Sequence, residues 1–395
     1  MIGPISSRSL FRNLVALLTL SFAYLSSQAQ TYTIVHSFTG APTDGDKPNG
    51  DLIQDAAGNL YGTSFQGGTH DLGVVFKLDP SGAETILYNF TGAADGSHPE
   101  AGLFQDPTGN LYGMTTDGGS EGLGTVFELD TNDVLTSLHS FKGVPDGALP
   151  ISKLVSVNGD LYGVTQYGGI SSGSCAGSCG TVFKVTKGGK ETVLYRFTPG
   201  ADGSNPQSVI RDSTGNLYGV ASGGGGAVFR LDTTGALTVL YRFTGGASSP
   251  VGRPTLDANG NIRGVTEFGG THPCCGIIFR LDADGQLTTI HNFSRDAEGY
   301  RPYAGLLDAG GTLYGTARYG GDFDLGVLFE ISNTGQYTVL PSFAGTGAGD
   351  GEDSQVGGVT LGSDGSIYGA TWHGGTGKCK GGSYPGCGVI FKYTP

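Results

Sequence analysis

Apolar and polar residues alternate along this chain in short runs, and turns rich in Asp and Gly separate the runs. Asp accepts backbone N–H bonds at the start of a turn, and Gly takes positive φ at its end. Alternation at this spacing is typical of short antiparallel strands. In one representative stretch, where Asp-Pro-Thr-Gly-Asn fills residues 106–110, the pattern predicts strands at Glu100–Gln105, Leu111–Thr116, Gly124–Leu129 and Leu135–Phe141.

The same pattern occurs seven times, at spacings of 45 to 56 residues. Each copy contains Leu-Tyr-Gly or a close variant, then a Gly doublet, then a segment ending in Val/Ile/Leu-Phe; the fifth copy diverges most, with Ile262-Arg263-Gly264. Four strands in a repeat of this length predict one blade of a β-propeller. The marker glycines are Gly62, Gly113, Gly163, Gly219, Gly264, Gly315 and Gly369, and the marker phenylalanines are Phe76, Phe127, Phe183, Phe229, Phe279, Phe329 and Phe391.

The two ends of the chain complement each other. The last repeat stops after its third strand, Val389–Tyr393, and the segment Tyr32–Phe38 matches the fourth strands of other repeats, such as Thr85–Phe90. An N-terminal strand that completes the last blade closes the ring and removes strand edges that could aggregate. We therefore predict an all-β fold, a seven-bladed β-propeller of four-stranded blades over residues 30–395; a linear solenoid is the less favoured alternative.

Composition agrees with an ordered β protein. Gly makes up 73 of 395 residues, and hydrophobic residues make up 37%. This apolar content excludes a disordered chain, and the glycine content argues against helices. The formal net charge of −13 makes nucleic acid an unexpected partner.

The N-terminus has the pattern of a secretory signal peptide over residues 1–29. Arg8 and Arg12 precede an apolar run, Leu14–Leu25, and small residues Ser27 and Ala29 precede the expected cleavage point. The run is short for a membrane span. We therefore expect a secreted or periplasmic protein, a monomer, with no membrane span in the mature chain.

The repeat string resembles a known family. Asp-x-x-Gly-Asn-Leu-Tyr-Gly-x-Thr-x-x-Gly-Gly followed by Gly-Thr-Val-Phe, best seen at 106–129 and 212–231, is similar to the glycine-rich GloVer (Gloeo-Verruco) tandem repeat of exported bacterial proteins. The resemblance covers essentially all of the mature chain and implies bacterial origin and export. A weaker similarity links the Asp-x-x-Gly-Asn-Leu-Tyr portion to NHL-type propellers. No catalytic residues can be transferred from either.

Six cysteines form three close pairs between second and third strands of repeats 3, 5 and 7. An even count in an exported protein favours disulfides. Because these repeats are not neighbours, we expect pairing inside each loop. The expected pairs are Cys175 with Cys179, Cys274 with Cys275, and Cys379 with Cys387. Metal ligation is less favoured, because paired C-x₂-C spacing and nearby His are missing.

The loops after the second and fourth strands share one face of a propeller, which we call the long-loop face; the opposite face, with its short Asp-x-x-Gly turns, is the turn face. Two variable residues precede each Gly doublet on the long-loop face, and aromatic, amide, acidic and Arg side chains there suit sugar rings. The alternative is that they only pack between blades. The candidate ligand-binding residues are Phe65, Gln66, Asp117, Gln166, Tyr167, Glu267, Phe268, Arg318, Tyr319, Trp372 and His373.

Two further patterns contain residue types that can bind metal ions. Asp44, Asp46, Asn49 and Asp51 gather oxygen atoms of the kind calcium prefers, yet Asp and Gly are also ordinary turn residues. His36, His139 and His291 share one fourth-strand position, where other repeats have Tyr, so we interpret them as structural. The expectation is therefore no cofactor and no metal site, with calcium as a minor alternative.

Three functions remain open. The leading hypothesis is a binding protein for a glycan or cell-surface polymer, without catalysis. The second is a hydrolase or lyase acting on a polysaccharide through Asp117 or Glu267. The third is a scaffold that binds a protein partner through its rim. One propeller scaffold serves many functions, so the fold does not decide among them.

Overall fold

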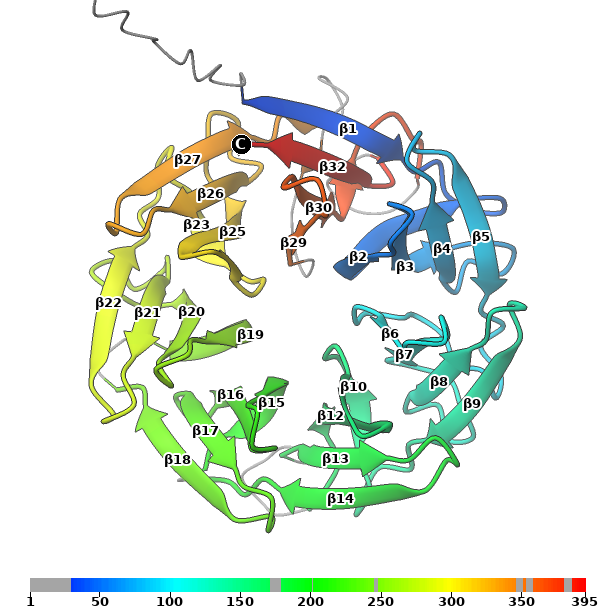
Figure 1. The fold of residues 1–395 in the computed structure, drawn as a ribbon, viewed down its shortest axis with the longest axis horizontal. Helices are drawn as coiled ribbons and strands as arrows, with labels where there is room; N and C mark the ends of the chain where they lie inside the picture. Colours follow the sequence, from blue (N-terminus) through cyan, green and yellow to red (C-terminus); the bar gives the residue numbers. More distant parts are fainter. Residues whose placement is uncertain are drawn as a thin grey trace, which may run out of the picture.

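The computed structural model describes residues 30–170, 179–200, 202–244, 248–345, 351–352, 358–379 and 386–395. Seven antiparallel sheets surround a central opening as the blades of a propeller (Figure 1). The predicted fold class is confirmed. The predicted signal peptide and Cys175 lie outside the described residues. Within the described part, no helix has the length and apolar character needed to cross a membrane.

The first four blades follow the chain in order, each running from the channel outward. Blade 1 comprises β2 (Gly45–Gln54), β3 (Leu60–Gly67), β4 (Val74–Leu78) and β5 (Glu84–Asn89). Blade 2 comprises β6 (Phe104–Gln105), β7 (Leu111–Thr115), β8 (Thr125–Leu129) and β9 (Leu135–Ser140). Blade 3 comprises β10 (Ala148–Pro150), β11 (Val155–Val157), β12 (Asp160–Tyr167), β13 (Thr181–Val185) and β14 (Glu191–Arg196). Blade 4 comprises β15 (Ser204–Arg211), β16 (Leu217–Gly223), β17 (Ala227–Leu231) and β18 (Leu237–Arg242).

The remaining blades repeat this order until the last one takes a strand from the N-terminal end. Blade 5 comprises β19 (Ser248–Leu256), β20 (Ile262–Phe268), β21 (Ile277–Leu281) and β22 (Leu287–Asn292). Blade 6 comprises β23 (Tyr300–Pro302), β24 (Leu307–Ala309), β25 (Thr312–Tyr319), β26 (Val327–Ile331) and β27 (Tyr337–Ser342). Blade 7 comprises β29 (Thr360–Leu361), β30 (Ile367–Thr371), β32 (Val389–Thr394) and β1 (Thr31–Ser37), with β28 (Gly351–Glu352) pairing β31 (His373–Gly374) beside them.

The N-terminal strand closes the ring as predicted. β1 pairs antiparallel with β32, with Thr31 opposite Thr394 and Ile34 opposite Phe391. Figure 1 shows β1 as the outer strand beside β32, with its head meeting β5 of blade 1. The predicted boundaries Tyr32–Phe38 and Val389–Tyr393 differ from the observed strands by one residue at each shifted end.

The Leu-Tyr-Gly signature reflects a steric requirement inside each blade. Its glycine lies directly opposite the marker phenylalanine of the next strand, as Gly62 does opposite Phe76. A Cβ at any of the seven glycines would lie 2.4–2.8 Å from the Cζ atom of that ring. Such a distance is shorter than van der Waals contact allows, so any larger residue would displace the ring.

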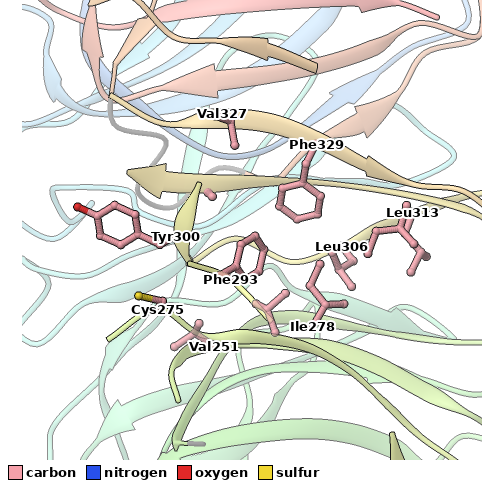
Figure 2. Close-up of a cluster of buried hydrophobic side chains, with 12 residues drawn as sticks. Val251, Cys275, Ile278, Phe293, Tyr300, Leu306, Leu313, Val327 and Phe329 are labelled. Carbon is pink, nitrogen blue, oxygen red and sulfur yellow. The ribbon is translucent and has the colours of Figure 1, made fainter. Parts of the chain in front are cut away.

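The marker phenylalanine also joins neighbouring blades. At every junction it contacts the phenylalanine that follows the outer strand of the preceding blade, at centroid distances of 5.1–5.6 Å. Figure 2 shows one such pair, Phe293 and Phe329, between blades 5 and 6, with Val251, Ile278 and Leu306 packed around it. The Phe343–Phe391 pair is tilted and the other six are edge-on, so every junction between blades contains one buried aromatic pair.

The Asp-x-x-Gly turn is linked to the Tyr of the same signature. In blade 4, Asp212 accepts the backbone N–H of Thr214 and Asn216 at 2.9 Å, and the Tyr218 hydroxyl donates to the same carboxylate at 3.3 Å. In the divergent fifth repeat, Arg263 stands in place of Tyr and donates to Asp257 at 3.4 Å. The substitution therefore preserves the contact.

The inner strand of the second blade is shorter than predicted. The sequence predicts a strand over Glu100–Gln105, but the ladder includes only Phe104–Gln105, with an isolated bridge between Ser97 and Asp117. Gly102 fits so closely against Asp51 that a Cβ would lie 2.8 Å from its backbone N and O atoms, and Thr63 of blade 1 donates to the Ala101 carbonyl at 3.2 Å. Ala101 and Gly102 therefore pack against blade 1, whereas Ser97 and His98 still bond their own blade.

Candidate functional site

The structure places the predicted variable residues at equivalent heights around the channel mouth on the long-loop face. They end the second strand of their blades or immediately follow it. The second residue of each pair lies opposite the inner strand in the same register in several blades, as Gln66 does opposite Asp46 and Tyr319 opposite Tyr300. The structure shows that these residues share one position along the second strands. Their role in ligand binding stays a prediction.

A second set of variable residues, not predicted from the sequence, lies beside the first set at the start of the inner strands. Each stands directly before a proline of the inner strand and has a left-handed backbone, with φ between +51° and +57°. Residues other than glycine rarely adopt this conformation, and residues before proline favour an extended one. The set comprises Lys47, His98, Leu149, Asn205, Ser249 and Arg301.

A contact between blades accounts for this unusual backbone. The N–H groups of five of the six residues donate to a carbonyl of the preceding blade, as His98 does to Leu72 at 2.8 Å. The following proline packs on a glycine of that blade; a Cβ on Gly73 would lie 2.5 Å from Pro99 Cδ. The backbone therefore repeats, while the side chains that it presents differ. The signal in the sequence was a repeated proline with variable flanking residues.

One group of side chains at the mouth comes from blades 7, 1 and 2 and comprises Trp372, Phe65, His98 and Asp117; we call it the Trp372 cluster. Phe65 lies between Trp372, at a centroid distance of 5.6 Å, and His98, at 4.7 Å. His98 Nδ1 lies 3.1 Å from the Asp117 carboxylate, whose side chain is 49% exposed. Phe65 therefore packs between blades, and Asp117 faces solvent.

A second group, the Arg301 cluster, comes from blades 5 and 6 and comprises Phe268, Arg301, Tyr319 and Tyr300. The Arg301 guanidinium lies 4.8 Å from the Phe268 ring centre and 5.9 Å from that of Tyr319. Tyr319 and Tyr300 stack at 5.2 Å. These are cation–π and stacking contacts between blades.

Tyr303 and Glu100 line a small cavity inside the ring, near charged groups of other blades. Burial raises the pKa of Tyr303, the charges of Glu100 and Glu267 raise it further, and Arg318 opposes them. Tyr303 belongs to blade 6, Glu100 to blade 2 and Glu267 to blade 5. Charged side chains from separate blades therefore surround Tyr303.

Several groups there have shifted pKa values. Burial, followed by the charge of Asp117, raises the pKa of Glu100 to about 7. Burial also raises the pKa of Glu267, which Arg301 and Arg318 partly offset. Burial lowers the pKa of His373 to about 4, and the charges of Lys47 and Arg318 act in the same direction. His373 is therefore neutral at pH 7, whereas Glu100 changes its protonation state near pH 7.

The remaining predicted residues are less closely grouped. Lys47 Nζ donates to Gln66 Oε1 at 2.6 Å, which ties this amide to the inner strand. Tyr167, in blade 3, is 36% exposed. Gln166 precedes it in β12 and is partly buried. These residues lie apart from the two clusters.

Cavities lie on both faces. On the long-loop face, about 520 Å³ lies between blades 5 and 6, lined by Arg295, Asp296, Tyr300 and Asp324 among others. On the turn face, a larger cavity of about 890 Å³ fills the other mouth and includes Arg211 in its wall. A cavity on the turn face could not be predicted from the sequence, because the turns there are short and uniform.

Three charged residues lie between two cavities of the channel. Asp51, Lys153 and Arg253 line both the turn-face cavity and a small cavity of about 70 Å³ above it. Arg253 lies 3.6 Å from the Asp51 carboxylate, and burial lowers the pKa of Lys153. These residues come from blades 1, 3 and 5, at a position where Gly102 and Gly305 stand in blades 2 and 6.

The cysteine pairing agrees with expectation wherever it is described. Cys274 is bonded to Cys275, and Cys379 is bonded to Cys387. Cys179 is also disulfide-bonded, and Cys175, its predicted partner, lies outside the described residues. Disulfides are typical of proteins that fold outside the reducing cytosol.

The oxygen-rich loop does not assemble into one ligand set. Asp44 accepts hydrogen bonds from Thr39 and lies near His36 and Glu84. Asp46 lies near the Cys379–Cys387 disulfide, and Asp51 faces Arg253. Within the described residues, these acids point to different neighbours.

Two solved structures resemble this fold with TM-scores above 0.5. The extracellular domain assigned to a one-component system of B. thetaiotaomicron is 11% identical, with a TM-score of 0.56 over 92% of this chain and 40% of that one. A puromycin hydrolase is 12% identical, with a TM-score of 0.56 over 82% of this chain and 50% of that one. A gluconolactonase from Xanthomonas campestris is 14% identical, with a TM-score of 0.44 over 73% of this chain and 86% of that one. At these identities the likeness concerns the fold alone.

No curated protein matches the sequence. The family model described as the Gloeobacter/Verrucomicrobia repeat matches twice, over residues 21–225 and 170–384. The two matches together span most of the chain, including all seven Leu-Tyr-Gly signatures. The expected resemblance is thus confirmed, and the protein belongs to the Gloeobacter/Verrucomicrobia repeat family.

Proposed function

We propose that this protein is an exported binding protein that recognises a glycan or cell-surface polymer at the channel mouth on its long-loop face, without catalysis. One observation carries the proposal: aromatic, acidic and cationic side chains from blades 7, 1 and 2 and from blades 5 and 6 contact one another at this mouth, in the Trp372 cluster and the Arg301 cluster. A set of different side chains on a repeated backbone is the arrangement expected of a recognition surface.

The chemistry of the mouth supports a sugar ligand. Tyr167 presents an exposed aromatic ring, and the Arg301 cluster places a guanidinium between two rings. Glu100 and Glu267 supply carboxyl groups that can accept or donate hydrogen bonds, depending on their protonation. The adjacent cavity between blades 5 and 6 gives room for a polar extension of the ligand. Apolar faces beside polar edges match the two sides of a sugar ring.

The test is binding to a glycan array by the purified protein and by three variants, each checked for an unchanged unfolding midpoint. Tyr167→Ala and Trp372→Ala alter the long-loop mouth, whereas Arg211→Ala alters the exposed wall of the turn-face cavity. We expect binding that the first two variants weaken about tenfold or more, as loss of a buried aromatic anchor does. Arg211→Ala should bind as the unaltered protein does.

Two results would overturn the proposal. Binding lost only in Arg211→Ala would move the site to the turn face. An absence of glycan binding by folded protein would remove the glycan proposal and leave the protein scaffold as the next candidate, to be tested by partners that co-purify.

A hydrolase or lyase is the second candidate, favoured by the ionisation of Glu100. A carboxyl group with a pKa near 7 can act as a general acid or base, and the exposed Asp117 beside His98 provides a second carboxylate. This candidate predicts turnover of the bound glycan that is lost in Glu100→Gln, Asp117→Asn or Glu267→Gln while binding persists. Binding without turnover in the unaltered protein would exclude it for that ligand.

A further inference from the structure

Three metal-ligating side chains meet at the outer junction of blades 7 and 1, far from the channel mouth. His36 lies on β1, Asp44 lies in the loop between β1 and β2, and Glu84 is the first residue of β5. One ligand atom from each lies within 4.8 Å of the other two. Figure 1 shows the head of β1 beside the start of β5, where these segments meet.

The imidazole of His36 is oriented as a ligand. Its Nδ1 atom lies 3.2 Å from the carbonyl oxygen of Gly82. A carbonyl only accepts, so Nδ1 carries the proton of the neutral ring, and Nε2 keeps its lone pair. A backbone carbonyl on the other ring nitrogen is the usual support of a metal-binding histidine.

The lone pair of Nε2 faces two carboxylates. Nε2 lies 3.7 Å from Asp44 Oδ1 and 3.8 Å from Glu84 Oε2. These separations are too long for hydrogen bonds. They approach the spacing of about 3.3–3.6 Å between two ligands of one tetrahedral zinc ion, as follows from bond lengths of about 2.0–2.2 Å. One nitrogen and two carboxylate oxygens thus lie close enough to share an ion, and Asp44 Oδ1 also accepts the backbone N–H of Gly45 at 2.6 Å.

Both carboxylates are buried, and one has an unmet hydrogen-bonding demand. Each side chain is only 10% exposed. Asp44 is held by the backbone N–H and hydroxyl of Thr39, both at 2.7 Å from Oδ2. Glu84 Oε1 is buried without a hydrogen-bond partner. A buried carboxylate requires a compensating cation or proton.

Other junctions of the same ring show what replaces this arrangement. Where the outer strand carries Tyr instead of His, the hydroxyl donates directly to the acid, as Tyr88 does to Asp95 at 3.1 Å. The position equivalent to Glu84 is then Leu135, which packs in the same apolar cluster as Tyr88. The junction with Tyr195 and Asp202 is built alike, with a 2.8 Å bond and Leu237.

A similar triad occurs between blades 2 and 3, with one difference. His139 Nε2 lies 3.0 Å from Asp146 Oδ2, a direct hydrogen bond that occupies the nitrogen. Glu191 completes that group. Because His139 already bonds Asp146, we expect no metal ion at this junction, and it serves as a control.

We propose that His36, Asp44 and Glu84 bind a divalent transition-metal ion, zinc by its ligand chemistry, between blades 7 and 1. One imidazole and two carboxylates suit zinc, whereas calcium prefers oxygen ligands alone. The ion joins the N-terminal strand to blade 1 and so strengthens the closure of the ring. This site is separate from the proposed glycan site and independent of it.

The test uses untagged full-length protein, stripped of metal with a chelator and titrated with ZnCl₂ in a calorimeter, with bound zinc measured by elemental analysis. We expect one zinc per chain and a higher unfolding midpoint in its presence. The double variant His36→Tyr with Glu84→Leu should lose at least about 100-fold in affinity, more than the loss of a supporting group causes. Its side chains copy Tyr88 and Leu135, so it should fold.

The matched control is His139→Tyr with Glu191→Leu, which makes the same exchange between blades 2 and 3 and should bind zinc as the unaltered protein does. Absence of zinc from the unaltered protein would overturn the proposal and assign the cluster to a proton, since burial and then Asp44 raise the pKa of Glu84 to about 9. Equal zinc binding by both double variants would overturn it as well.

Discussion

The backbone N–H of Lys47 donates a hydrogen bond of 2.9 Å to the carbonyl oxygen of Cys387, and this contact ties the inner strand of blade 1 to blade 7. Asn205 bonds Cys179 at 2.9 Å and Arg301 bonds Cys275 at 2.8 Å in the same way. In each pair, the cysteine nearer the C-terminus therefore presents the carbonyl that accepts the N–H of the next blade. The disulfides fix the loops on which these contacts depend.

The Cys379–Cys387 bond should contribute more to stability than the Cys274–Cys275 bond. The first closes a loop with a sequence separation of eight, and the second joins adjacent residues. Replacing both cysteines of the first pair by Ser should lower the free energy of unfolding by about 2–3 kcal/mol, the entropic value for a short loop. Urea unfolding of the two double variants measures the difference. Equal losses in both would refute this account.

Gly62→Ala should destabilise the protein although it adds one methyl group. A Cβ at this position would lie 2.6 Å from Phe76 Cζ and 2.8 Å from Leu52 Cδ2. Both neighbours are buried, so the added group must displace packed side chains, at a cost of about 1–3 kcal/mol. Gly188→Ala is the control, because its Cβ would meet only Thr186 Oγ1 at 3.8 Å. Chemical unfolding should show a loss for Gly62→Ala alone.

Phe38→Ala should weaken ring closure. Phe38 is fully buried and contacts Phe76 of blade 1 at a centroid distance of 5.1 Å. Removing a buried Phe side chain costs about 3–5 kcal/mol. Phe323→Ala removes the same side chain from a position that is 59% exposed and should change the unfolding midpoint little. Similar midpoints for the two variants would mean that the closing junction tolerates a cavity.

Glu100 should make the protein less stable as the pH rises. Its pKa is about 7 in the folded protein, against 4.5 for an exposed Glu. Between these values the folded state binds more protons than the unfolded state, so stability falls from about pH 4.5 to pH 7 and stays reduced above. Glu100→Gln removes this penalty, about 3 kcal/mol at pH 8 from the size of the shift. Urea unfolding at pH 5 and pH 8 tests it; an identical pH dependence in both proteins would contradict the assignment.

The fold could be predicted because the repeat encodes contacts that every blade needs. The marker glycine lies opposite the marker phenylalanine in every blade, as Gly62 does opposite Phe76, although the loop between their strands varies in length. Asp212 with Tyr218 marks the turn between the first two strands of its blade. The divergent repeat was recognised because the rest of its pattern persists, and Arg263 bonds Asp257 in place of Tyr.

The site was predicted only in part. The residues before the Gly doublets lie at one level, as their common position suggested, but Lys47, His98 and Arg301 were missed. Their left-handed backbone arises from a hydrogen bond to another blade, and proline after them suggests an extended conformation instead. Glu100 was missed because only the folded ring brings it near Tyr303.

The pairing of β1 with β32 sets an order in time. Blades 1 to 6 each draw their strands from one continuous stretch of chain, so each can form as soon as that stretch is available. The strand made first must wait, unpaired, for the strand made last. Contacts this distant in sequence are slow to form, and an open edge is the state most exposed to association with other chains. During biosynthesis, β1 therefore remains able to pair with strands of other chains until β32 is made.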